Sequence, residues 1–163
     1  MRKGQNHWGW GFQEQRPPRD EIEAVGRLAA ERLGFEPLPV EDPVPLESID
    51  LPAPRIQPPS ALAGLCSSDP PDRAGHAYGK AYRDIVRAFR GRYDNPPDVV
   101  AWPRSDDDVA ALLEWCADAN LAAIPFGGGT SVVGGVEPRL EGDYAGAVSI
   151  DLTDLDQVLE VDR

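Results

Sequence analysis

The sequence predicts an α/β-like α+β fold, in which a strand–helix–strand unit follows a helical and proline-rich extension. Three observations predict it. Apolar β-prone segments alternate with an amphipathic helical pattern between residues 94 and 152. A glycine-rich stretch directly follows the second of these apolar segments. Eight prolines fall within residues 35–59, where they block helix and ladder hydrogen bonds. We therefore place the extension at residues 1–93 and a compact unit at residues 94–163.

The extension is expected to begin with a polar stretch and then a helix. Asp20 is the predicted N-cap, and Glu23 three residues later completes a capping box. An apolar stripe repeats at helical spacing through Ile22, Val25, Ala29 and Leu33. Gly34 is suited to end this helix, and residues 35–59 then form an extended arm or linker. Helical spacing returns across residues 76–92 and predicts a second helix there, through Tyr78, Tyr82, Ile85, Val86 and Phe89.

The sequence of the compact unit predicts a strand, a helix and a second strand. Residues 99–102 are β-prone and end at Pro103. Ser105 is the predicted N-cap of a helix whose first turn carries three aspartates, which favour the positive end of the helix dipole. The helix is expected to bury Val109, Leu112, Leu113 and Cys116. Asn120 is suited to a left-handed end, and residues 121–125 form the next strand.

Short links between these elements predict a βαβ unit with parallel strands. Residues 145–152 are expected to form a third strand. The glycine-rich stretch follows the second strand, at the carboxyl end, where ligands bind in open α/β sheets.

The glycine-rich stretch is the most informative part of the sequence. Five glycines occupy the nine positions from 127 to 135, with Thr130 and Ser131 between them. Glycine allows a backbone to turn its N–H groups outward, and successive N–H groups form a concave anion site to which the two hydroxyls add donors. The expected guest is a phosphate or pyrophosphate of a nucleotide cofactor.

Two familiar nucleotide motifs do not fit this stretch. Gly129 and Gly134 have the spacing of a Walker A loop, but Gly135 stands where the lysine is needed. Gly127 and Gly129 begin a dinucleotide fingerprint, but Val132 occupies the third glycine position.

The order P-x-G-G-G-T-S-x-x-G-G instead resembles the pyrophosphate loop of the flavin-binding domain shared by vanillyl-alcohol oxidase and p-cresol methylhydroxylase (PCMH). Residues 97–103 are similar to the family's PDxVxxP strand, and residues 148–155 to its v-D-L-x-x-L segment. The similar segments together cover residues 74–163. The resemblance implies that the chain holds the first part of a PCMH-type FAD-binding domain.

Within that superfamily the chain is most similar to the alkyldihydroxyacetonephosphate synthase-like branch of FAD-linked oxidases. Residues 8–11 resemble the W-x-G-W-G opening of those enzymes, and residues 76–80 resemble the segment before their flavin domain. The resemblance implies FAD as the cofactor, and because no residue here sits in a motif that demands covalent attachment, we expect the FAD to be non-covalent. The resemblance also implies a cofactor site made of Pro125, Phe126, Gly127, Gly128, Gly129, Thr130, Ser131, Gly134 and Gly135.

The residues identify no catalytic group. His76 and Lys80 lie either near the flavin or substrate or on an ordinary helix surface, and the sequence leaves both readings open. No Cys/His cluster has metal-ligand spacing. In the resembled synthases the catalytic groups lie in the C-terminal part, so we transfer none of their roles to this chain. The resemblance also implies a flavin domain that continues past Asp162, so we interpret the chain as a fragment or a truncated gene product. The reaction of the whole enzyme is open between oxidation of a hydroxy acid or alcohol and ether-lipid synthesis, and a non-catalytic remnant is the alternative.

Composition limits the partners. The formal net charge of −12 and a pI near 4.5 argue against nucleic-acid binding, which needs dense Lys and Arg. No apolar run follows the basic start and none is long enough to span a membrane, so we expect no secretory signal, no integral membrane segment and a cytoplasmic location. We expect a small-molecule substrate and leave a homodimer of the full-length protein open.

Overall fold

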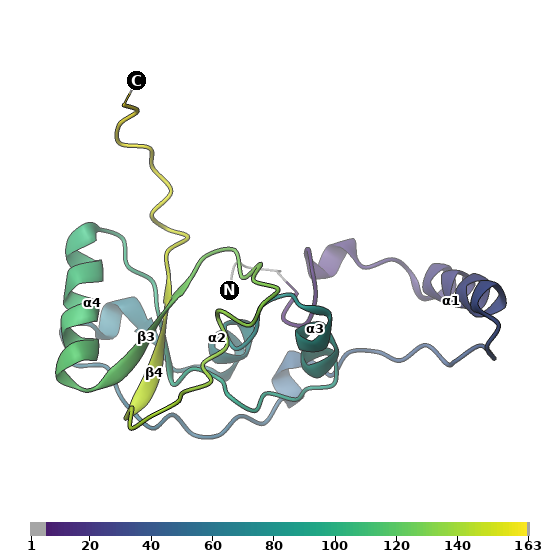
Figure 1. Cartoon of the computed structure of the whole chain (residues 1–163), viewed down its shortest axis with the longest axis horizontal. Helices are drawn as coiled ribbons and strands as arrows, with labels where there is room; N and C mark the ends of the chain where they lie inside the picture. The colour runs from purple at the N-terminus through teal and green to yellow at the C-terminus, as the bar shows by residue number, and fades with distance from the viewer. Residues whose placement is uncertain (1–5, 163) are drawn as a thin grey trace.

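The computed structural model describes residues 6–162, and within them the chain forms a four-stranded sheet, away from which an arm that carries a helix extends (Figure 1). Its strand order is β1-β2-β4-β3. β1 runs antiparallel to β2, whereas β2, β4 and β3 are parallel. In chain order the helices and strands are α1 (Arg19–Leu33), β1 (Cys66–Ser67), α2 (Pro70–Gly75), α3 (Tyr82–Phe89), β2 (Val99–Ala101), α4 (Asp106–Asp118), β3 (Leu121–Phe126) and β4 (Gly146–Asp151). The predicted α+β class is confirmed.

The elements β2, α4 and β3 form the predicted βαβ unit, and β4 lies between its two strands. β4 pairs with β2 through Val148 and Val99, and with β3 through Gly146 and Leu121. The carboxyl ends of three parallel strands therefore meet at one edge of the sheet. The glycine-rich loop (residues 125–135) leaves β3 at that edge.

Helix α4 covers one face of the sheet and follows its sequence signals closely. The Ser105 hydroxyl accepts a hydrogen bond from the Asp108 amide at 3.1 Å, which confirms the predicted N-cap. Leu112 and Cys116 are buried against the strands. Leu113 is 48% exposed, so its predicted place on the buried face is wrong. Successive residues lie about 100° apart around a helix, and Leu113 falls outside the stripe that the sheet covers.

A second buried cluster lies beside the sheet and comes from residues before the compact unit. It contains Ile49, Ala74, Ala77, Tyr78, Ala88 and Tyr93. The predicted helix across residues 76–92 is wrong as one element, because α2 ends at Gly75 and α3 begins only at Tyr82. The aromatic spacing there partly reflects tertiary packing, since the rings of Tyr78 and Tyr93 stack at 5.3 Å. The boundary between residues 93 and 94 stays a prediction.

Helix α1 lies apart from the sheet, at the end of an extended arm (Figure 1). Its N-cap is Pro18 and Asp20 lies within the first turn, so the predicted capping box is wrong. Pro18 has the extended backbone that an N-cap needs (φ −62°, ψ 155°), and the helix begins at the next residue. Gly34 ends the helix in the left-handed conformation, as predicted. No helix in residues 6–162 is long and apolar enough to cross a bilayer.

Candidate functional site

A cavity of about 230 Å³ lies where the glycine-rich loop leaves β3. We call it the loop cavity. The loop contributes the side of the cavity formed by residues 126–129, and the end of β4 contributes Asp151. The described residues that line it are Asn6, Phe12, Gly75, Lys80, Phe126, Gly127, Gly128, Gly129, Asp151 and Thr153.

The loop offers amide donors that the protein itself does not use. The N–H groups of residues 127–131 donate no hydrogen bond to any described residue. A Cβ placed on Gly127 would meet nothing within 4 Å, and one on Gly128 would meet only the Thr130 methyl group at 3.5 Å. Open space therefore lies beside successive free donors, which is the geometry of an anion site.

Gly129 is required by both conformation and packing. Its φ is +66°, in the left-handed region that glycine favours. A Cβ there would lie 2.7 Å from the tip of the Phe126 ring, which is too close for two carbon atoms. The Phe126 ring in turn lies 4.4 Å from the ring of His76, centroid to centroid. The turn is thus held against a buried aromatic cluster.

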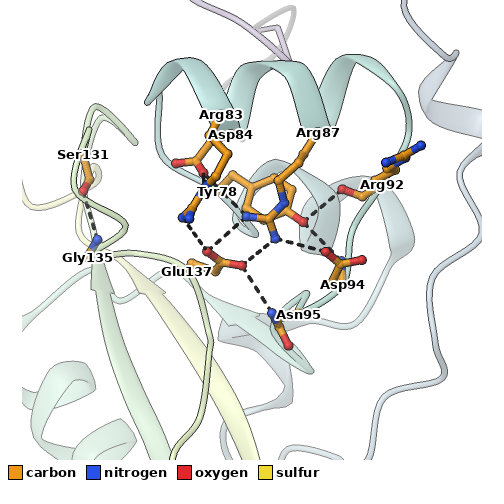
Figure 2. A network of polar contacts seen from close by, with 10 residues as sticks. All are labelled: Tyr78, Arg83, Asp84, Arg87, Arg92, Asp94, Asn95, Ser131, Gly135 and Glu137. Carbon is orange, nitrogen blue, oxygen red and sulfur yellow. Dashed lines mark hydrogen bonds and ion pairs between the residues drawn. The ribbon is translucent and has the colours of Figure 1, made fainter.

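Only part of the predicted site faces the loop cavity. Thr130, Ser131, Gly134 and Gly135 are not among the described residues that line it, and Pro125 is exposed within β3. The Ser131 hydroxyl instead accepts a hydrogen bond from the Gly135 amide at 3.1 Å (Figure 2). Gly134 has a φ of +78°, which this turn requires. The second half of the loop therefore closes on itself.

A segment distant in sequence fixes the middle of the loop. The Lys80 amide donates a hydrogen bond to the Ser131 carbonyl at 2.6 Å. A Cβ on Gly79 would overlap that carbonyl oxygen and contact its carbon, so the two backbones approach as closely as glycine allows. The break between α2 and α3 thus places residues 79–80 against the loop.

We predict that Gly79→Ala destabilises the fold. The added methyl group overlaps the Ser131 backbone, and overpacking of this kind lowers the free energy of unfolding by about 1–3 kcal/mol. Urea denaturation followed by circular dichroism measures this change. Gly64→Ala is the matched control, because a Cβ there meets nothing within 4 Å. Equal unfolding midpoints for the two variants would contradict the close approach.

A buried histidine–carboxylate pair lies behind the loop cavity. His76 Nε2 is 2.9 Å from Asp151 Oδ2, and His76 Nδ1 is 2.7 Å from the Asp72 carbonyl oxygen. The Trp102 indole also donates to Asp151 Oδ2, at 3.2 Å. His76 is completely buried, so the surface reading of this residue is wrong. The two rings and the carboxylate together brace the wall of the cavity.

Sequence reasoning assigned no site role to Asp151 or Thr153. A signal was available, because a carboxylate directly follows the apolar residues of the third predicted strand at the ligand-binding edge. Asp151 Oδ1 accepts from the Thr153 amide at 2.9 Å, so each carboxylate oxygen has a donor. Burial alone would raise the pKa of Asp151, but the hydrogen bonds from His76 and Thr153 lower it to about 2.

We predict that Asp151 makes stability depend on pH in acid. Its pKa falls from 3.8 in the unfolded chain to about 2 in the folded one, so its contribution is present above pH 4 and is lost as the pH falls towards 2. The loss is about 2 kcal/mol of unfolding free energy. Urea titrations at several pH values between 2 and 6 measure it. Asp151→Asn should flatten this part of the profile, and an unchanged slope would contradict the assignment.

A network of ion pairs holds the chain beyond the loop to helix α3 (Figure 2). Arg87 donates to both carboxylate oxygens of Glu137, at 2.7 and 3.3 Å, and lies 4.2 Å above the Tyr78 ring. Asn95 donates to Glu137 as well, at 3.2 Å. The hydrogen bond from Arg87 is the main cause that lowers the pKa of Glu137. The residues that follow the loop are therefore anchored by a buried ionised carboxylate.

The described residues offer neither a metal site nor a reactive cysteine. Within residues 6–162 no three His, Cys, Asp or Glu side chains are grouped so as to hold a metal ion. Cys66 and Cys116 are free, and burial raises the pKa of each thiol to about 11. Both thiols are therefore protonated at neutral pH and are poor nucleophiles. The described arrangement instead offers free amide donors beside the loop, which is a geometry suited to an anion.

Comparison with known proteins agrees with this geometry. The family model described as "FAD binding domain" matches residues 97–163. An alkyldihydroxyacetonephosphate synthase from Trypanosoma brucei brucei is 41% identical over 90 residues, which cover 55% of this chain and 15% of that protein. A probable mitochondrial D-lactate dehydrogenase from Danio rerio is 38% identical over 88 residues, which cover 51% of this chain and 17% of that protein.

The structural comparison extends over nearly the whole chain. A solved structure of alkyldihydroxyacetonephosphate synthase matches 98% of it with a TM-score of 0.79 and 26% sequence identity, and the match covers 34% of that structure. The fold is therefore that of the first part of the PCMH-type FAD-binding domain, as predicted. The chain spans only a small part of the length of the relatives it matches.

Proposed function

We propose that the glycine-rich loop binds the pyrophosphate of FAD. The premise is that residues 97–163 belong to the FAD binding domain family. The observation that carries this proposal is the run of free amide donors at residues 127–131 beside open space. Backbone N–H groups suit a pyrophosphate because they offer hydrogen bonds without side chains that would fill the site. The residues present therefore fit the phosphate part of the cofactor.

The proposed site comprises the nine predicted residues, with different roles in its two halves. Residues 126–129 face the loop cavity and would contact the cofactor. The turn closed by Ser131 and Gly135 would hold the loop in shape. Asp151 and Thr153 join the site from β4 and the residues just after it. Bound FAD would supply the redox chemistry, while these residues bind and orient it.

We propose that the cofactor is held without a covalent bond. Some members of the superfamily attach flavin through histidine, cysteine or tyrosine. None of these three residue types is found among the described residues that line the loop cavity. His76 is close, but both of its ring nitrogens face oxygen acceptors within the protein.

We propose that the whole protein is an FAD-dependent enzyme acting on a small molecule. The relatives include both an ether-lipid synthase and a probable D-lactate dehydrogenase, so the reaction stays open between these two chemistries. The resemblance to the synthase, which covers nearly the whole chain in structure, favours the first. We further propose that the full-length protein is located in the cytoplasm and forms a homodimer.

The visible absorption spectrum of the purified protein tests FAD binding. We expect a flavin band that passes into the supernatant after acid precipitation, as non-covalent FAD requires. The measurement is made on this chain and on the protein at its natural length. A band in the longer protein alone means that further residues complete the site. No flavin in either, even after FAD is added, would refute the proposal and favour a non-catalytic remnant.

A further inference from the structure

One charged side chain in the loop cavity has no assigned role. Lys80 is the only lysine or arginine among the described residues that line it, and Asp151 is the only carboxylate. The Asp151 oxygens already accept hydrogen bonds from His76, Trp102 and the Thr153 amide. The ammonium group of Lys80 is therefore the positive charge of this cavity that remains available to a ligand.

The main chain holds Lys80 in place beside the loop. Its amide is bonded to the Ser131 carbonyl at 2.6 Å, and the preceding Gly79 is in close contact with the same group. The root of the side chain is thus fixed relative to the donors at residues 127–129. A mobile surface lysine has no such constraint.

The protein provides Lys80 with few hydrogen-bond acceptors. An ammonium group has three donors, yet among the described residues Nζ reaches only the Asn6 carbonyl oxygen, at a long 3.4 Å. The residue is also partly removed from water. Burial lowers the pKa of Lys80, and the nearby Asp84 carboxylate opposes this shift.

A ligand anion would satisfy this arrangement. The chain carries a formal net charge of −12, so it attracts no anion by its overall charge and needs a local cation. We infer that the Lys80 ammonium contacts a phosphate oxygen of the nucleotide held by the glycine-rich loop, an inference that rests on the proposed function. Lys80 thereby supplies from outside the loop the charge that a Walker lysine supplies from within.

Chemical labelling of lysine tests this contact directly. The sequence contains two lysines, Lys3 and Lys80, so acetylation at each is resolved by peptide mass spectrometry. FAD-free protein is treated with sulfosuccinimidyl acetate with and without added FAD. We expect FAD to slow acetylation of Lys80 several-fold and to leave Lys3, the internal reference, unchanged.

Affinity measurements on variants provide a second readout. Lys80→Met keeps the side-chain length and removes the charge, and a lost charge-assisted hydrogen bond raises the dissociation constant of FAD about 10- to 100-fold. Lys80→Arg should restore most of the affinity. Arg27→Met, which removes one positive charge from the exposed face of α1, should leave it unchanged. Added salt should shrink the difference between wild type and Lys80→Met.

The outcomes separate this inference from the proposed function. If wild-type protein binds FAD but Lys80→Met binds it within twofold, or if Lys80 is acetylated at the same rate in both conditions, the contact is refuted and FAD binding stands. If the wild type binds no FAD, both proposals fail together. Circular dichroism of each variant confirms that the fold is intact.

Discussion

Gly128→Asp should abolish FAD binding while leaving the fold intact. A Cβ at Gly128 meets only the Thr130 methyl group at 3.5 Å, an ordinary contact, so the protein has room for the new side chain. The carboxylate would, however, stand beside the donors that we assign to the pyrophosphate. Placing like charges together costs several kcal/mol, which corresponds to an affinity loss of at least about 100-fold.

The ratio of visible flavin absorbance to protein absorbance measures this loss in the purified protein. Gly128→Ala separates bulk from charge and should retain much of the flavin. Gly64→Asp adds the same charge at an open position in a turn that is distant in sequence from the glycine-rich loop. This variant should retain its full flavin content. Full flavin content in Gly128→Asp would show that this part of the loop does not face the phosphates.

Arg87→Met should cause the largest loss of stability among the variants considered. The change leaves the Glu137 carboxylate, whose side chain is 6% exposed, without its main cation. It also removes a cation 3.7 Å from Asp84, whose two carboxylate oxygens are buried and have no hydrogen-bond partner within residues 6–162. Breaking a buried ion pair by removing one member costs about 3–5 kcal/mol.

Urea denaturation of Arg87→Met measures this cost, and Arg90→Met is the matched control. Arg90 follows the same helix, has an exposed side chain and carries the same charge. Adding Glu137→Gln to Arg87→Met should cost little more, because the carboxylate left unpaired is then neutral. A loss below about 1 kcal/mol for Arg87→Met, or fully additive effects in the double variant, would contradict the role of this network.

Sequence patterns predicted those features of the fold that depend on residues nearby in the sequence. The N-cap at Ser105, the left-handed Asn120 and the strands on either side of α4 depend on neighbours a few residues away, and the structure confirms each of them. The same holds for the end of α1 at Gly34. An aspartate near the start of a helix was a less reliable sign of the N-cap. In α1 the N-cap is Pro18, which has the extended backbone of a cap, and Asp20 lies inside the helix.

Contacts between distant segments could not be predicted in this way. The pair of His76 and Asp151 joins residues 75 positions apart, and no periodicity near either residue reports it. The break between α2 and α3 brings Gly79 against Ser131, and local helical spacing cannot reveal such a contact. Sequence reasoning therefore located the loop and its flanking strands but left two readings open for Lys80, and the structure was needed to place Lys80 in the wall of the cavity.

The contacts that join residues 76–80 to the loop and to Asp151 connect segments far apart in sequence. They therefore determine when the loop cavity can form during synthesis. Residues 76–80 leave the ribosome well before the loop and before Asp151, so the nascent chain carries one wall of the cavity without the other. The cavity closes only after β4 has been made and has inserted between two strands that precede it. If FAD binds this cavity as we propose, it can stabilise the protein by mass action only late in folding, and a shortage of FAD should leave the earlier folding steps unchanged.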